Sequence, residues 1–304
     1  MSAESRFLTL LRLLAHDPAA QGLRDDVAIL PVGSARLILT SDTMVEGVHY
    51  LPTDPPAAIG WKLAAVNLSD LAAKGARPVG CLLNYALSGN DGWDAAFLEG
   101  LGEALERHAM PLLGGDTVKM PAGSACSYSL TAIGEATGPV PTRAGAQPGD
   151  RLYITGPVGD AGVGLTLASA DPGASGPLVD AYRRPRPRLI EGALLSPLAT
   201  AMMDVSDGLL IDAARLAQAS GVAIVIDHIP LSPALEKVRG ASTAVQIAAA
   251  RAGDDYELLF TLPRGQTPPV RAIPVGHVAA GSGLTLRIDG AAIPLPDSLG
   301  WEHG

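Results

Sequence analysis

The sequence has few cysteines, few aromatic residues and no long apolar run, and each shortage excludes a class of protein. Its two cysteines, Cys81 and Cys126, lie in apolar, strand-like segments. We expect both to be buried and reduced, as is usual in cytoplasmic proteins. No stretch approaches the roughly 18 apolar residues that a membrane-spanning helix needs, and the N-terminus has no secretory signal. We therefore predict a cytoplasmic protein with no membrane partner.

Positive charge is also scarce. The chain has 22 Lys and Arg residues against 31 Asp and Glu residues, which gives a net charge of −9. This balance offers no electrostatic basis for binding nucleic acid. If the ligand is itself an anion, a cation has to lie between it and so acidic a protein.

The remaining composition is that of a well-packed α/β protein. Apolar residues make up 47% of the 304 positions, enough to form large cores, and the length favours two domains. A connector rich in Pro and Gly, residues 138–150, divides the chain into domains 1–137 and 138–304. Apolar periodicity predicts helices at 55–74, 94–108, from about 160, 188–198 and 209–220, and strands at 37–40, 79–87, 111–113, 127–133, 152–155, 202–204, 222–227 and 256–262.

Acidic residues recur at the ends of the apolar runs. One such cluster alone is typical of a helix cap or a turn. Five of them favour a site for a hard divalent cation, because Mg²⁺ prefers carboxylate, water and phosphate oxygens. The clusters are Asp25-Asp26, Ser41-Asp42, Gly115-Asp116, Asp204 with Asp207, and Asp254-Asp255.

Asp70 gives a sharper indication. On the predicted helix 55–74 it continues the apolar stripe of Ile59, Leu63 and Val66. A core-facing carboxylate is costly unless it is ion-paired, capped by hydrogen bonds or bound to a metal. The residue is therefore a candidate metal ligand, with an ion pair or a cap as the structural alternative.

Neither of the common nucleotide-binding motifs is present: the sequence has no phosphate-binding P-loop and no protein-kinase catalytic loop. A glycine-rich turn at 155–164 could present backbone N–H groups to phosphate, or it could be an ordinary tight connection. Arg143 could contribute charge to a nucleotide phosphate, and His49 could contact substrate. No nucleophile or general base stands out, so we predict metal-assisted transfer without a covalent intermediate.

Six segments taken together resemble the thiamine-monophosphate kinases, a family related to aminoimidazole ribonucleotide synthetase and selenophosphate synthetase. They occur in the family's order and span nearly the whole chain. The segments are DDVAIL (25–30), TSDTMVEGVHY (40–50), AVNLSDLAAKGARP (65–78), GGDT (114–117), MDVSDGL (203–209) and GDDYELLF (253–260).

The resemblance implies a two-domain fold of the aminoimidazole-ribonucleotide-synthetase type, with mixed sheets flanked by helices. It also implies a homodimer paired through its N-terminal sheets, and transfer of the γ-phosphoryl group of ATP to thiamine monophosphate with the help of several Mg²⁺ ions. By motif position, the metal ligands would be Asp26, Thr40, Ser41, Asp42, Asp70, Asp116, Asp204 and Asp207, the nucleotide contacts Gly115, Asp116, Arg143 and Ser206, and the thiamine contacts His49, Asp254 and Trp301.

The sequence departs from the family pattern at two places. Gly22-Leu-Arg24 stands where the family has Gly-Ile-Gly, and Asp254 stands where it has glutamate. Two alternatives remain: an enzyme like aminoimidazole ribonucleotide synthetase, or a non-catalytic dimer that binds nucleotide or thiamine phosphates. The first lacks support because the characteristic Asp-Gly-Val-Gly-Thr-Lys string is replaced by Asp42-Thr-Met-Val-Glu-Gly47, and the second because the full set of acids is retained.

Overall fold

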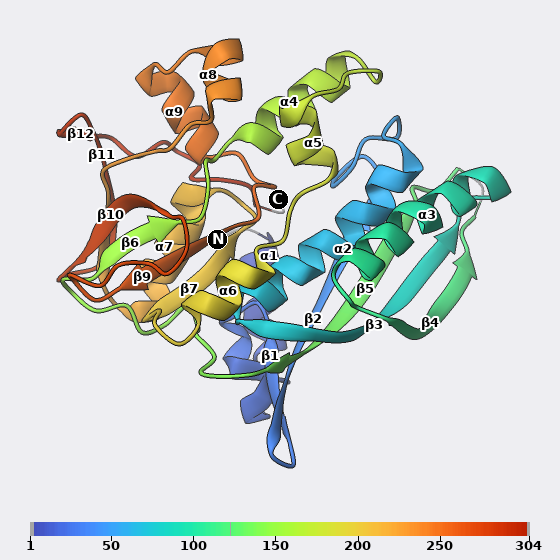
Figure 1. Ribbon diagram of the computed structural model, residues 1–304, viewed down its shortest axis with the longest axis horizontal. Coiled ribbons are helices and arrows are strands. Elements are labelled where there is room, and N and C mark those ends of the chain that lie inside the picture. The colour runs from blue at the N-terminus through green and yellow to red at the C-terminus, as the bar shows by residue number, and fades with distance from the viewer. Residues whose placement is uncertain (1–2, 122, 303–304) are drawn as a thin grey trace.

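The computed structural model describes residues 3–121 and 123–302, which form two β-sheets on either side of a buried helix, α2 (Figure 1). The first sheet has five strands in the order β1-β2-β5-β3-β4. All neighbours are antiparallel except β3 and β4, which are parallel and joined through helix α3 (Asp91–Arg107). The strands are β1 Ala28–Val32, β2 Ala35–Val45, β3 Ala76–Leu87, β4 Leu112–Lys119 and β5 Ser127–Ala136.

Helix α2 (Pro56–Ala73) is buried on all sides. Two prolines stand at its start. Gly75 follows its end with a positive φ of 60°, a conformation that residues other than glycine rarely adopt. One side of α2 packs on the first sheet, and Ala72 and Ala73 pack against Met202 and Phe260 of the second half. The helix therefore carries its polar side chains into the boundary between the two halves of the protein.

The second sheet has seven strands in the order β12-β11-β8-β10-β6-β9-β7. Strands β7 and β9 are buried throughout because helix α7 covers one face and α2 with α6 covers the other. The strands are β6 Arg151–Ile154, β7 Ala201–Val205, β8 Ala223–Ile226, β9 Glu257–Leu262, β10 Ile273–Ala279, β11 Gly283–Ile288 and β12 Ala291–Ile293. The other helices are α1 Ala3–Leu11, α4 Asp160–Ala170, α5 Pro177–Arg183, α6 Leu189–Leu195, α7 Leu209–Ser220, α8 Pro233–Arg239 and α9 Thr243–Ala250, with a 3₁₀ turn at Pro18–Leu23.

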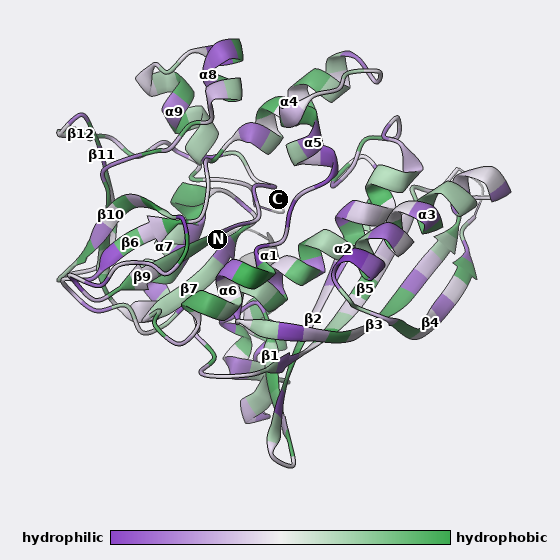
Figure 2. Ribbon diagram, in the orientation of Figure 1, coloured by the Kyte–Doolittle hydropathy of each residue, from purple (hydrophilic) through white to green (hydrophobic). Residues whose placement is uncertain are grey.

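Among the described residues, the outer face of the first sheet, away from α2 and α3, has exposed side chains on β2 and β3. Figure 2 shows both hydrophobic and hydrophilic residues along β3 and β4, and burial alternates over residues 81–85 of β3. Leu82 and Asn84 point outward, whereas Cys81, Leu83 and Tyr85 are buried against the helices. The outer face thus combines apolar and polar residues.

The two-domain α/β fold class predicted from the sequence is confirmed, and helices 55–74 and 209–220 are found within a residue of their predicted ends. Four strand predictions are too short by three residues or more. Those at 79–87 and 127–133 each miss three residues of β3 and β5. Strands β2 and β4 run on through Ser41-Asp42 and Gly115-Asp116, which therefore lie inside strands rather than after them. The neighbouring strands β5 and β3 supply backbone hydrogen-bonding partners to these residues, and the local sequence does not reveal this pairing.

Smaller differences concern a helix and a cysteine. The helix predicted at 188–198 is the shorter α6. Both cysteines are free, but Cys126 is only half-buried.

The boundary between the two domains, predicted between residues 137 and 138, stays a prediction. Among the helices of the described residues, none combines the length and the apolar character needed to cross a bilayer.

Candidate active site

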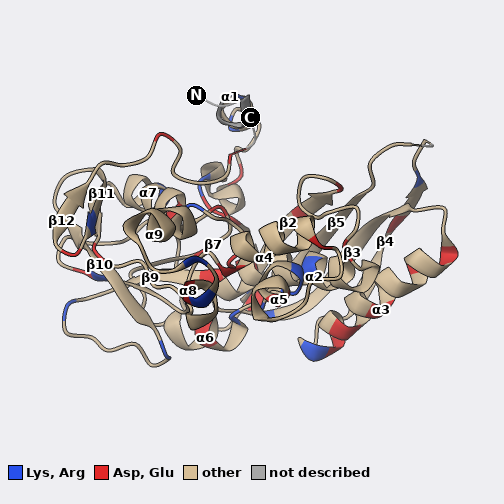
Figure 3. Ribbon diagram, turned by 90° about the horizontal axis from the view of Figure 1, so that it is seen from above, with Lys and Arg blue, Asp and Glu red and all other residues tan. Residues whose placement is uncertain are grey.

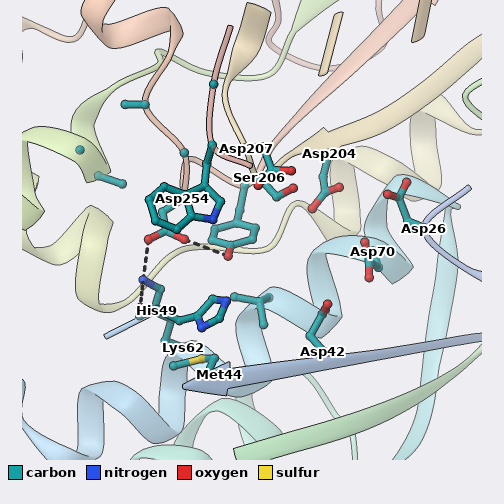
Figure 4. Close-up of a pocket in the computed structure, with 18 of the residues that line it drawn as sticks. Asp26, Asp42, Met44, His49, Lys62, Asp70, Asp204, Ser206, Asp207 and Asp254 are labelled. Atoms are coloured by element: carbon teal, nitrogen blue, oxygen red, sulfur yellow. Dashed lines mark hydrogen bonds and ion pairs between the residues drawn. The ribbon is translucent and has the colours of Figure 1, made fainter. Parts of the chain in front are cut away.

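A cavity of about 720 Å³ opens between the two halves of the protein (Figure 4). Asp42 and Met44 of β2 and Lys62 and Asp70 of α2 line it from the first half. The second half contributes the turn after β7 and the segment before β9. Figure 3 shows acidic segments gathered where β2, α2 and β7 approach one another. We call the end with Asp26, Asp42, Asp70, Asp204 and Asp207 the acidic end, and the end with His49, Lys62, Asp254 and Tyr256 the lysine end.

Three carboxylates converge at the acidic end from segments far apart in the sequence. Asp26, Asp70 and Asp204 each offer an oxygen atom, and these atoms lie within 4.8 Å of one another. The hydroxyl of Thr40 donates to Asp70, and the Ser69 Oγ donates to Asp204 Oδ2 at 2.6 Å. These hydrogen bonds orient the acids toward a common point.

The pKa directions indicate excess negative charge at this point. Burial and the nearby Asp26 raise the pKa of Asp204 to about 8 and that of Asp42 to about 6. Burial, Asp42 and Asp204 hold the pKa of Asp70 well above its usual range. A bound cation would relieve this repulsion. The donor set consists of hard oxygens, so the residues fit Mg²⁺.

Asp26 differs from the other acids because two cations face it. Burial opposes its ionisation, yet Arg143 and Lys74 outweigh burial and lower its pKa. Arg143 donates through Nε to Asp26 Oδ2 at 3.2 Å, and Lys74 Nζ lies 3.6 Å from the same oxygen. The fully buried Lys74 also lies 2.5 Å from Asp25 Oδ1. Asp26 is thus ionised and fixed in place in the protein itself.

Asp207 is paired within the protein as well. Arg215 contacts its carboxylate and also donates to Asp212 Oδ1 at 2.8 Å. The fully buried Asp212 accepts from the Asp207 backbone N–H at 3.1 Å. Arg215 lines the cavity beside Asp207.

At the lysine end, Lys62 of α2 reaches across the boundary between the halves. Its Nζ lies 2.7 Å from Asp254 Oδ2 and 3.1 Å from the carbonyl oxygen of His49. Tyr256 donates to the other carboxylate oxygen of Asp254 at 3.0 Å. The His49 Nδ1 accepts from the Val45 N–H at 3.0 Å, so the proton of the neutral ring lies on Nε2.

The structure brings most of the predicted site residues together. Thr40 lies behind the cavity wall, hydrogen-bonded to Asp70. The predicted residues that line the cavity are Asp26, Asp42, His49, Asp70, Arg143, Asp204, Ser206, Asp207, Asp254 and Trp301.

Besides Thr40, three predicted residues do not line the cavity. Ser41 points to the outer face of the first sheet, where its hydroxyl lies 2.9 Å from that of Thr131. Gly115 and Asp116 lie within edge strand β4, and Asp116 is opposite the outward-pointing Asn84. Within a single chain these residues are separate from the acidic end.

Ala161 and Gly162 of the glycine-rich turn at 155–164 line the cavity, and contact of this turn with phosphate stays a prediction. Its Gly159 N–H donates to both oxygens of Asp255, at 3.0 and 2.8 Å, so that donor is engaged inside the protein. Sequence reasoning overlooked Lys62, Lys74, Asp212 and Arg215. For the two lysines the available signal was a lysine within the mostly apolar helix at 62 and another directly after it at 74.

The fold and this acid-lined cavity define a class of two-domain protein related to AIR synthase. Residues 24–136 match the family described as "AIR synthase related protein, N-terminal domain", and residues 147–289 match "AIR synthase related protein, C-terminal domain".

Curated relatives narrow the class. The "Thiamine-monophosphate kinase" of Caulobacter vibrioides is 36% identical, with 97% of this chain and 89% of the relative covered. The protein of the same name from Escherichia coli K12 is 37% identical over 93% of this chain and 91% of its own. The solved structure described as "AaThiL complexed with AMPPCP and TMP" superposes with a TM-score of 0.88 at 31% identity, covering 100% of this chain and 99% of that one. The chain belongs to the thiamine-monophosphate kinase family.

Proposed function

We propose that this protein transfers the γ-phosphoryl group of ATP to thiamine monophosphate. An oxygen of the acceptor phosphate forms a bond to the γ-phosphorus, the bond from that phosphorus to the bridging oxygen breaks, and ADP leaves with the electron pair. The products are thiamine diphosphate and ADP. The observation that carries the proposal is the convergence of Asp26, Asp70 and Asp204 on a cavity shared with the lysine end, in a chain of this family.

The acidic end fits magnesium. Asp26, Asp42, Asp70, Asp204 and Asp207 would hold the ions. Bound there, Mg²⁺ would neutralise the phosphate oxygens of two anionic substrates. The chain's own part is preorganisation: Thr40 and Ser69 orient two of the acids, and Arg143 and Lys74 keep Asp26 ionised.

Five of the substrate contacts proposed from the family resemblance line the cavity. Arg143 and Ser206 would serve the nucleotide, and His49, Asp254 and Trp301 the thiamine side. The acceptor is a phosphate whose oxygens are already ionised at neutral pH. The chain therefore needs no general base, which agrees with the absence of one among the predicted residues.

We also propose that the protein works as a homodimer joined through the outer face of its first sheet. Leu30, Val32, Leu82 and Val118 expose 37–52% of their surfaces on the strands of this sheet. A second copy packed on this face would bury them and would enclose Ser41 and Asp116. Leu82→Glu should give a monomer in light scattering, whereas a dimeric variant would contradict this interface.

The function is tested by ADP release from ATP and Mg²⁺ with thiamine, thiamine monophosphate or aminoimidazole precursors as acceptors, with products identified by mass. We expect thiamine diphosphate from thiamine monophosphate alone. Turnover of an aminoimidazole precursor would indicate a synthetase instead. Binding of ATP and thiamine monophosphate without turnover would indicate a non-catalytic binding protein.

A further inference from the structure

Lys62 occupies an unusual position for a lysine. It lies in a helix whose residues are buried from Ala58 to Ala73, and only 3% of its side chain is exposed. A buried ammonium group is costly unless strong partners replace its water. Its partners are the Asp254 carboxylate, the His49 carbonyl oxygen and the face of the Tyr182 ring, whose centroid lies 4.3 Å from Nζ.

Asp254 depends on these contacts for its orientation. Its φ is +69° and that of Tyr256 is +50°, values that non-glycine residues rarely adopt, so the segment is held by its surroundings. The backbone N–H of Asp254 donates to Ser206 O at 2.8 Å. Lys62 and Tyr256 each take one carboxylate oxygen. Each oxygen keeps a further acceptor site for a ligand in the cavity.

The segment that carries His49 is fixed at two points. Lys62 holds the carbonyl oxygen of His49 at one. At the other, the buried Asp54 accepts from Tyr182 Oη and Arg183 Nε, both at 2.8 Å, and from the Leu51 N–H at 2.9 Å. Tyr182 also forms the face on which the Lys62 ammonium rests. Lys62 therefore joins three separate segments at the lysine end.

We infer that Lys62 is a positioning residue for the acceptor: its ammonium group fixes the Asp254 carboxylate and the His49 backbone in the geometry that acceptor binding requires. This inference rests on the proposed function. Lys62 also balances the charge of Asp254 in a cavity that already carries five other aspartates, so its loss would repel an anionic acceptor. It does not contact the acidic end, and nucleotide binding should not depend on it.

The kinetic test compares wild type with Lys62→Met, which keeps the aliphatic length and removes the charge. We expect the KM for thiamine monophosphate to rise by about 10- to 100-fold, because small displacements of positioning groups have effects of this size. The KM for ATP should change by less than about threefold. Lys62→Arg keeps the charge on a differently shaped group, so its KM for thiamine monophosphate should lie between those of wild type and Lys62→Met. An unchanged acceptor KM in folded Lys62→Met, or equal rises in both KM values, would overturn the inference.

A matched control is Trp61→Phe. Trp61 is the preceding residue of α2, and its Nε1 donates to Pro185 O at 3.0 Å, so it too joins the two halves but does not line the cavity. Trp61→Phe should leave both KM values unchanged. Because Lys62 acts in part through Asp254, the variant that combines Lys62→Met with Asp254→Asn should raise the acceptor KM by less than the product of the two single effects.

A second measurement needs no substrate and separates this inference from the proposed function. In hydrogen–deuterium exchange of the substrate-free protein, Lys62→Met should increase exchange at residues 46–55 and 252–257, and Trp61→Phe should not. If wild type forms no thiamine diphosphate, the proposed function fails. Faster exchange at these two segments in Lys62→Met would still support the positioning role of Lys62. Unchanged exchange at both segments would refute the positioning role of Lys62, whether or not the protein forms thiamine diphosphate.

Discussion

The two ends of the cavity handle buried charge in opposite ways. At the acidic end Asp42, Asp70 and Asp204 crowd together, and their pKa values are raised because burial, and after it the neighbouring carboxylates, disfavours ionisation. At the lysine end the carboxylate of Asp254 meets a buried ammonium at 2.7 Å and a tyrosine hydroxyl at 3.0 Å. One end is electrostatically incomplete without a cation, and the other is complete within the chain.

This difference indicates how the site divides its tasks. An incomplete set of hard oxygen donors is suited to an exchangeable divalent ion and to the phosphates that accompany it. A complete, internally paired cluster is suited to holding a substrate in one orientation, since its groups do not rearrange when the substrate binds. Lys74 and Arg143 place fixed positive charges behind Asp26. The acidic end therefore contains one internally paired carboxylate beside the carboxylates that need a cation.

The largest expected effect comes from breaking the acidic end. Asp70→Asn should lower turnover by at least about 100-fold, because a charged ligand at the point of phosphoryl transfer is lost. The same change should raise the thermal unfolding midpoint of the metal-free protein, because one of several repelling carboxylates is neutralised. Asp171→Asn, in an exposed turn, serves as the control. Full activity of Asp70→Asn would remove Asp70 from the metal site.

The next effect concerns the cation behind Asp26. Lys74→Met should lower the free energy of unfolding by about 3–5 kcal/mol, because it removes the ion-pair partner of the buried Asp25 carboxylate and leaves the buried Asp26 carboxylate with Arg143 alone. Lys62→Met should cost less, since the Asp254 side chain is 31% exposed and water can replace the lost ammonium. Urea unfolding of both variants measures the difference, and equal losses would contradict this ranking.

A smaller effect should appear in the pH dependence of stability. In the metal-free protein the raised pKa of Asp204, about 8, means that the folded state binds a proton that the unfolded state has already released. The stability present below the unfolded pKa is therefore lost as the pH rises through the folded pKa. Thermal midpoints in EDTA should fall between about pH 6 and about pH 8. Asp204→Asn should flatten this slope, and an unchanged slope in that variant would assign it to other groups.

The smallest effect is expected where an ion pair is exposed. Arg77 and Glu135 lie 2.7 Å apart on the first sheet, with 63% and 37% of their side chains exposed. Arg77→Ala should change the free energy of unfolding by less than about 0.5 kcal/mol, because water screens the pair. A loss as large as that of Lys74→Met would show that burial does not govern the strength of ion pairs in this protein.

The sequence by itself determined the elements whose signals are local, and it determined the family. Helix α2 is delimited by the prolines at its start and by Gly75 after its end, and Gly221 marks the end of α7. The apolar stripe on α2 predicted that Asp70 is buried, and it is, although the structure buries the other faces of this helix as well. Such features depend on residues a few positions apart, where helical periodicity and capping are decisive.

Only the tertiary structure decided which charges meet. Strands β2 and β4 continue through the predicted strand-end motifs because β5 and β3 supply hydrogen-bonding partners, and this places Ser41 and Asp116 on the outer face rather than in the cavity. Lys62 and Asp254 are 192 residues apart in the chain, and Ser69 and Asp204 are 135 apart. A lysine or serine in a helix has the same local pattern whether it is paired or not. Its role follows from the segment that folding brings beside it, and the cost of burying an unpaired charge is what fixes that pairing.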